Sequence, residues 1–190
     1  MDLDTLSRFQ QLDPQNMLAH IDGLPDQIEA AWAHGQSLPL PDLNGVTQIV
    51  LCGMGGSAIG GSLLAALTAN ECRVSFTVNR DYDLPAWATG PHTLVIGSSH
   101  SGGTEETVSA FQQAIERKTK LMAITGGGQI AEMCKEAGGT VWPFDYKSQP
   151  RAAVGYSFAL PLALFCRVGW IQDKSAELAG AVAAMREQQK

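Results

Sequence analysis

The chain has 190 residues, of which 45% are hydrophobic and 17% charged, a balance typical of a globular protein and unlike that of a disordered or fibrous chain. Its formal net charge of -6 argues against binding to a nucleic-acid backbone, which requires a positive field. A small phosphate ester remains compatible with this charge, because backbone N–H groups at a helix N-terminus bind anions without any formal positive charge.

Cysteine and histidine usage predicts reduced thiols and no structural metal. The four cysteines form no C-x-x-C pair and lie inside apolar segments, as buried thiols of a cytosolic protein do. The four histidines show no spacing suited to metal ligation. The N-terminal sequence MDLDTLSRFQ has no apolar stretch of the kind found in a secretory signal, so we expect a cytoplasmic protein.

Residues 1–44 are predicted to form a helical arm, because apolar side chains recur every three or four residues between Leu18 and Trp32. The chain then breaks at SLPLPDLNG and changes to short apolar runs that alternate with helical segments. The predicted strands are 47–53, 72–78, 92–99, 120–125 and 140–144. The predicted helices are 58–69, 104–118, 129–137 and the apolar stretch after Arg151.

Strands that alternate with helices favour a mostly parallel sheet covered on both faces. We therefore predict an α/β fold for residues 45–190, namely a three-layer αβα sandwich with a five-stranded parallel sheet. Residues 152–166 are uncharged, but they are too few to span a bilayer and contain Pro161. They predict a buried core helix that is kinked or broken near this proline, and no membrane segment.

The first candidate loop for ligand binding is CGMGGSAIGG, residues 52–61. In a parallel sheet, ligands bind beyond the carboxyl ends of the strands, where loops enter helix N-termini. Gly55 and Gly56 let the backbone approach an anion closely, and Ser57 adds a hydroxyl near the start of the helix.

The second candidate loop is SSHSGGTEET, residues 98–107. Here the hydroxyls of Ser99, Ser101 and Thr104 can join the N–H groups around Gly102 in binding an anion. We predict that both loops hold a phosphate monoester, mainly through neutral donors. The acidic pair that follows Thr104 is expected to point outward and to favour the helix dipole.

Two alternatives compete with a phosphate site. Ser101 or Thr104 can serve simply as a helix cap. The first loop also fits the G-x-G-x-x-G/A pattern of a dinucleotide site, which favours an acidic residue at the end of the second strand. The sequence VNRDYD places Asn79 there and Asp81 two residues later, a poor match.

Taken in order, these motifs resemble the sugar isomerase (SIS) domain, and more closely the N-terminal half of the bifunctional phosphoglucose/phosphomannose isomerases. The resemblance rests on CGMGGSAIGG, SxSGxTEET, LMAIT followed by glycines, and QPRAAVGYSF, and it extends from about residue 20 to residue 190. Family members usually carry an aromatic residue and an asparagine where this chain has His100 and Gly103. His100 can be read as a catalytic acid for opening the sugar ring, but we expect it to be a loop residue on the solvent side.

The resemblance implies a three-layer fold of the flavodoxin-like kind and a cytoplasmic homodimer that interconverts fructose 6-phosphate with glucose 6-phosphate or mannose 6-phosphate. No metal or redox cofactor is implied. By the family's pattern the two loops line the sugar-phosphate site and hold the phosphate, and Arg151 lies near C1 and C2 of the sugar. There its guanidinium can stabilise the enediolate through which aldose–ketose isomerisation passes.

Members of this family carry two SIS domains, and the second has no counterpart in residues 1–190. The resemblance implies that the general base glutamate, the ring-opening histidine and a lysine come from the second half or from the partner subunit. Two other functions stay open on sequence alone: a non-catalytic SIS module that binds or senses sugar phosphate, and a dinucleotide-binding Rossmann-like domain.

Overall fold

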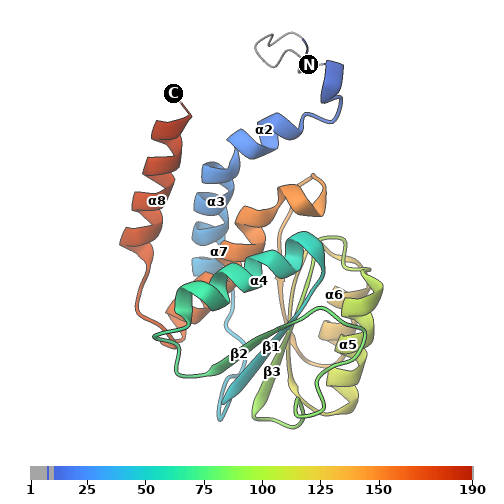
Figure 1. Ribbon diagram of the computed structural model, residues 1–190. Coiled ribbons are helices and arrows are strands. Elements are labelled where there is room, and N and C mark those ends of the chain that lie inside the picture. The colour runs from blue at the N-terminus through green and yellow to red at the C-terminus, as the bar shows by residue number, and fades with distance from the viewer. Residues whose placement is uncertain (1–7, 9–10, 190) are drawn as a thin grey trace.

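Five parallel strands form one sheet in the order β2-β1-β3-β4-β5 (Figure 1). The computed structural model describes Arg8 and residues 11–189. The strands are Gln48–Cys52 (β1), Ser75–Asn79 (β2), Thr93–Ser99 (β3), Lys120–Thr125 (β4) and Thr140–Pro143 (β5). The predicted α/β class and the five-stranded parallel sheet are thereby confirmed.

Helices cover both faces of the sheet, which gives the predicted three layers (Figure 1). The helical segments are Met17–Asp22 (α2), Leu24–Ser37 (α3), Gly55–Thr68 (α4), Glu105–Glu116 (α5), Gly128–Glu136 (α6), the 3-10 turn Pro150–Ala152 (η1), Val154–Arg167 (α7) and Ser175–Gln188 (α8). Helices α5 and α6 pack on one face, and α3, α4 and α7 pack on the other.

The core follows the alternation of side chains along each strand. In β1, Ile49 and Leu51 pack toward α4 and α7, whereas Val50 between them packs toward α5 and α6. Strand β3 is buried along its whole length, as expected for a central strand of a parallel sheet. Two apolar clusters therefore hold the sheet between its helical layers.

Helix α3 of the predicted arm is part of the helical layer on the α7 side of the sheet. Ala31 is fully buried, and a Cβ added to Gly35 would lie 2.7 Å from the Cβ of Ala163. The indole N–H of Trp142 donates to the Pro39 carbonyl at 2.6 Å, which joins the end of the arm to β5. Residues 1–7 and 9–10 of the arm lie outside the described residues.

Helix α7 is the predicted buried core helix, and it is not broken at Pro161, because it continues from Val154 to Arg167 with this proline inside it. A proline removes one backbone hydrogen bond from a helix interior. Here α7 is packed between α3 and α4, and nine of its fourteen residues are buried. This packing holds the helix together where local backbone bonding is weakest.

The winding direction of the chain reverses between β1 and β3, which are neighbours in the sheet. The connection after β1 runs through α4 on one face, and the connection after β3 runs through α5 on the other (Figure 1). This strand order places a crevice at the carboxyl ends of β1 and β3, the usual ligand position in such folds. Both candidate loops lie there.

Candidate functional site

The loop after β1 leads directly into the first turn of α4. The Ala58 N–H donates to the Met54 carbonyl at 3.2 Å, so the N–H groups of Gly55 and Gly56 precede the regular helical bonds. Met54 occupies the N-cap position, and no side chain caps the helix there. Ser57 is buried in this first turn.

The loop after β3, residues 100–104, is organised by Ser99. The buried Ser99 side chain accepts a hydrogen bond from the Gly102 N–H at 3.0 Å and lies 2.9 Å from the hydroxyl of Thr104. Gly102 has a φ of +71°, and a Cβ there would lie 1.7 Å from the Gly127 carbonyl oxygen. Gly102 therefore shapes the loop, and its N–H donates to the Ser99 hydroxyl in this structure.

The capping alternative finds no support in the geometry of α5. Thr104 occupies the N-cap, yet its side chain makes no capping hydrogen bond. The first helical bond runs from the Val108 N–H to the Thr104 carbonyl at 2.9 Å, so the N–H groups of residues 105–107 precede it. Two helix N-termini without a capping side chain thus meet at one crevice, an arrangement suited to binding an anion.

Arg151 lies in η1, and the fold brings its backbone against Gly56. A Cβ added to Gly56 would lie 2.3 Å from the Pro150 carbonyl oxygen and 2.9 Å from the Arg151 nitrogen. On α7, the Ser157 hydroxyl donates to the Gly56 carbonyl at 2.9 Å. Residue 56 must therefore be glycine, and the exposed Arg151 side chain starts from a fixed position beside the β1–α4 loop.

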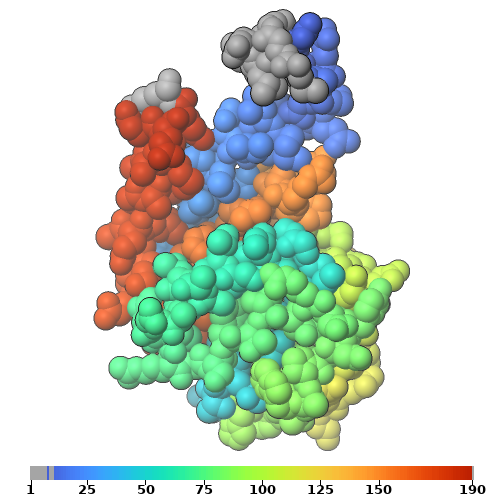
Figure 2. All heavy atoms as spheres, in the orientation of Figure 1, coloured from blue at the N-terminus to red at the C-terminus, as the bar shows by residue number. Residues whose placement is uncertain are grey.

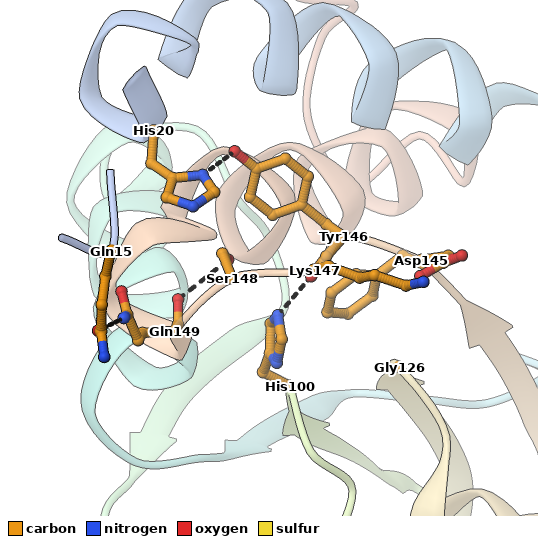
Figure 3. Close-up of a pocket in the computed structure, with 10 residues that line it drawn as sticks. Gln15, His20, His100, Gly126, Asp145, Tyr146, Lys147, Ser148 and Gln149 are labelled. Carbon is orange, nitrogen blue, oxygen red and sulfur yellow. Dashed lines mark hydrogen bonds between the residues drawn. The ribbon is translucent and has the colours of Figure 1, made fainter. Parts of the chain in front are cut away.

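A pocket of about 530 Å³ lies beside the crevice, at the ends of β4 and β5 (Figure 3). His100 lines this pocket, and its Nε2–H donates to the Tyr146 carbonyl at 2.9 Å. His100 is half-buried and faces residues 144–149 instead of solvent, which differs from our expectation. The local sequence gives no sign of this contact, because its partner is 46 residues away.

The end of β2 does not offer the acidic group that a dinucleotide site favours. The side-chain amide of Asn79 donates to the carbonyls of Asp81 and Asp83, and the Asp81 carboxylate accepts the Tyr82 N–H at 2.7 Å. These groups bond within their own turn. Glu105 is exposed and accepts a bond from the Tyr82 hydroxyl at 3.3 Å, consistent with the expected outward orientation.

Burial keeps two of the thiols protonated. It raises the pKa of Cys52 to about 12 and that of Cys134 to about 11, which argues against thiolate chemistry at either position. Within the part of the chain that the structure describes, no three His, Cys, Asp or Glu side chains come together as metal ligands would. Among the described helices, none has both the length and the apolar character needed to cross a membrane.

Comparison with known proteins identifies relatives along almost the whole chain, although no protein-family model matches it. A bifunctional phosphoglucose/phosphomannose isomerase of Caldicellulosiruptor bescii is 40% identical over 178 residues, which are 92% of this chain and 52% of the relative. The chain is a homologue of the bifunctional phosphoglucose/phosphomannose isomerases. An isomerase of the same name from Aquifex aeolicus is 38% identical over 125 residues, which are 65% of this chain and 38% of that relative. The chain spans about half the length of the C. bescii isomerase.

Solved structures of other proteins share the SIS fold with this chain, the homologue of the phosphoglucose/phosphomannose isomerases. Tagatose-6-phosphate ketose/aldose isomerase from Escherichia coli superposes with a TM-score of 0.59 and 19% identity, over 91% of this chain and 48% of that one. The Vibrio vulnificus NanR protein, complexed with ManNAc-6P, superposes with a TM-score of 0.56 and 18% identity, over 96% of this chain and 70% of that one. At these identities the likeness concerns the fold alone.

Proposed function

We propose that the chain is the phosphate-binding half of an aldose–ketose isomerase that converts glucose 6-phosphate and mannose 6-phosphate to fructose 6-phosphate. The observation that carries the proposal is the meeting of two uncapped helix N-termini at the β1/β3 crevice, with η1 beside them. The name of the relatives supports hexose phosphates as substrates. The remaining catalytic groups come from a second domain or a partner subunit.

Each group at the crevice has a distinct role in this proposal. The N–H groups at the start of α4 and the hydroxyls of Ser57, Ser101 and Thr104 bind the phosphate and the sugar, whereas Ser99 and Gly102 hold the loop in shape. The guanidinium of Arg151 stabilises the negative charge of the enediolate. The reaction moves a proton between two carbons and is redox-neutral, so the proposal includes no cofactor.

We propose in addition that the protein is a cytoplasmic homodimer. Helix α4 lies at the surface of the molecule (Figure 2). It carries no charged residue, and its side chains Ile59, Leu63 and Leu67 are 43%, 46% and 50% exposed. Two copies of this apolar stripe can pack against each other across a twofold axis, because neither copy brings charged side chains that would repel the other. The four free cysteines favour a reducing compartment.

The function is tested by titrating the chain with fructose 6-phosphate, glucose 6-phosphate, unphosphorylated fructose and NAD in calorimetry, and by assaying turnover. We expect both hexose phosphates to bind and to raise the melting temperature, and fructose and NAD to have no effect. Binding without turnover, even after addition of a complementing second domain, would indicate a sugar-phosphate sensor. A melting shift with NAD and none with hexose phosphates would overturn the proposal.

A further inference from the structure

The segment that leads to Arg151, residues 144–151, is here named the arginine strap. It leaves the end of β5 and runs along the pocket of about 530 Å³, which residues 144–149 help to line (Figure 3). At its far end the strap is fixed, because Pro150 and Arg151 contact Gly56 directly. Since an open pocket lies along its middle, the position of the strap there depends on specific side-chain bonds.

The Tyr146 hydroxyl bonds the strap to the N-terminal helices. Gln27 donates to this hydroxyl at 3.0 Å, and His20 Nδ1 lies 2.8 Å from it. Because the amide nitrogen of Gln27 can only donate, the hydroxyl proton of Tyr146 is left for His20 Nδ1. Gln27 is only 4% exposed, and burial raises the pKa of Tyr146, so this hydroxyl keeps its proton.

The Tyr146 backbone bonds the strap to the β3–α5 loop. Its carbonyl accepts the Nε2–H of His100 at 2.9 Å, and His100 lies between Ser99 and Ser101 in the chain. The carbonyl of His100 in turn accepts the Gly126 N–H at 3.2 Å, which fixes this loop to the end of β4. One residue of the strap is therefore bonded to both the arm and the candidate phosphate loop.

Ring contacts follow the same path as these hydrogen bonds. His100 meets Phe144 edge-on at 5.6 Å, Phe144 stacks on Tyr156 at 5.2 Å, Tyr156 contacts Tyr146 at 5.3 Å, and Tyr146 meets His20 edge-on at 5.6 Å. Aromatic pairs at these distances add packing energy and restrict ring orientation. A continuous series of rings thus connects the β3–α5 loop to α2.

We infer that Tyr146 is a positioning residue, which holds the arginine strap, and with it Arg151, at a fixed place relative to the β3–α5 loop. Gly56 fixes the strap at Arg151 itself, and Tyr146 fixes it five residues earlier. Removing the hydroxyl removes the hydrogen bonds of the strap to α2 and α3, while the aromatic ring and its contact with His20 stay. The inference builds on the role proposed for Arg151.

The first test needs no assumption about function. Hydrogen exchange is measured at the amides of Ala152 and Ala153, which donate to the carbonyls of Gln149 and Pro150 at 2.8 and 3.2 Å. In Tyr146→Phe we expect these amides to exchange about five- to tenfold faster, while the amides of α5 stay unchanged. The control Tyr82→Phe removes a hydroxyl bonded to Glu105 and should leave the strap as it is. Unchanged exchange at Ala152 and Ala153 in Tyr146→Phe would overturn the inference.

The second test is a double-mutant cycle on the dissociation constant of fructose 6-phosphate, with Tyr146→Phe, Arg151→Ala and the double variant. We expect Tyr146→Phe to weaken binding about three- to tenfold when Arg151 is present and less than about twofold when it is absent. Equal losses in both backgrounds would show that Tyr146 acts independently of Arg151. If the unmodified chain does not bind fructose 6-phosphate, the proposed function fails, and the exchange measurement alone decides the role of Tyr146.

Discussion

The side-chain oxygens of Ser99 and Thr104 lie 2.9 Å apart across the turn that connects β3 to α5. Ser99 is 1% exposed, whereas Thr104 is half-buried and Ser101 is exposed. Ser99 is therefore enclosed within the turn, whereas the hydroxyls of Ser101 and Thr104 are accessible to a ligand; the Ser101 hydroxyl also accepts the Gly103 N–H at 3.3 Å. Mutation should separate the two roles.

Replacing Ser101 or Thr104 by alanine should weaken hexose-phosphate binding by about 1–3 kcal/mol for each hydroxyl, with a smaller loss of folding stability. Ser99→Ala should lower both quantities, because its Oγ accepts the Gly102 N–H inside the turn. Ser109→Ala, one turn further along α5, is the control and should change neither. Calorimetry and urea unfolding measure the two effects; equal losses of affinity and stability at Thr104 would identify it as structural.

Gly56→Ala should destabilise the protein by about 1–3 kcal/mol and abolish binding of fructose 6-phosphate. The new methyl group would lie 2.3 Å from the Pro150 carbonyl oxygen, so the arginine strap must move away from α4. Gly180→Ala is the matched control, because nothing lies within 4 Å of a Cβ there and alanine favours the helix by roughly 0.5–1 kcal/mol. Tight binding by the Gly56→Ala variant would contradict the close contact.

Arg151→Lys should lower kcat more than it raises KM, measured with the complementing second domain present. Lysine keeps the positive charge but loses the planar fork that matches the two oxygens of an enediolate. Arg151→Ala removes both the positive charge and the planar guanidinium, so its kcat/KM should fall further than that of Arg151→Lys. A change in KM alone for the lysine variant would place Arg151 in ground-state binding.

Alkaline pH should destabilise the fold through the buried thiol of Cys52. Its pKa is raised from 9.0 to about 12 by burial, so the unfolded chain loses this proton first as the pH rises. The contribution of this thiol to the free energy of unfolding is complete below about pH 9. It falls between pH 9 and 12, by at most ~1.4 kcal/mol per pH unit. Urea unfolding between pH 8 and 10.5 should show that the free energy of unfolding declines less steeply with pH in Cys52→Ala than in the unmodified protein. Parallel declines in the two proteins would rule out Cys52 as the source.

Leu63→Glu should convert the proposed homodimer to a monomer, because it places a charge in the middle of the α4 stripe. Leu40→Glu is the control, since Leu40 is also exposed but lies in the segment after α3. Light scattering after size exclusion measures the mass, which should be about 40 kDa for two chains of 20.2 kDa each. A monomeric parent chain, or an unaffected Leu63→Glu dimer, would count against this interface.

The sequence predicts the sheet well because β1, β3 and β4 are buried on both faces and therefore appear as continuous apolar runs. The edge strand β2 is less clear. Its burial is partial and alternating, and it begins at Ser75 instead of at residue 72. Helix α4 starts three residues before the predicted position, because its glycines, which indicate a turn locally, are required by contact with η1 and α7.

Contacts between distant segments account for the features that the sequence does not predict. Helix α8 is missed because most of its apolar residues are alanines, which mark no apolar face, and only Leu178 and Val182 are buried. The continuity of α7 through Pro161 depends on α3 and α4. The orientation of His100 depends on Tyr146 in the arginine strap, a partner that no local pattern reveals.

The reversal of chain winding between β1 and β3 has a consequence for the response of the crevice to acid. It brings together backbone amides and alcohol groups from opposite sides of the sheet, none of which changes protonation between pH 5 and 8. A monoester bound there would retain the same donors throughout that interval. Its affinity would then follow the second ionisation of the ester itself, near pH 6, and acidification would weaken the complex by protonating the ester.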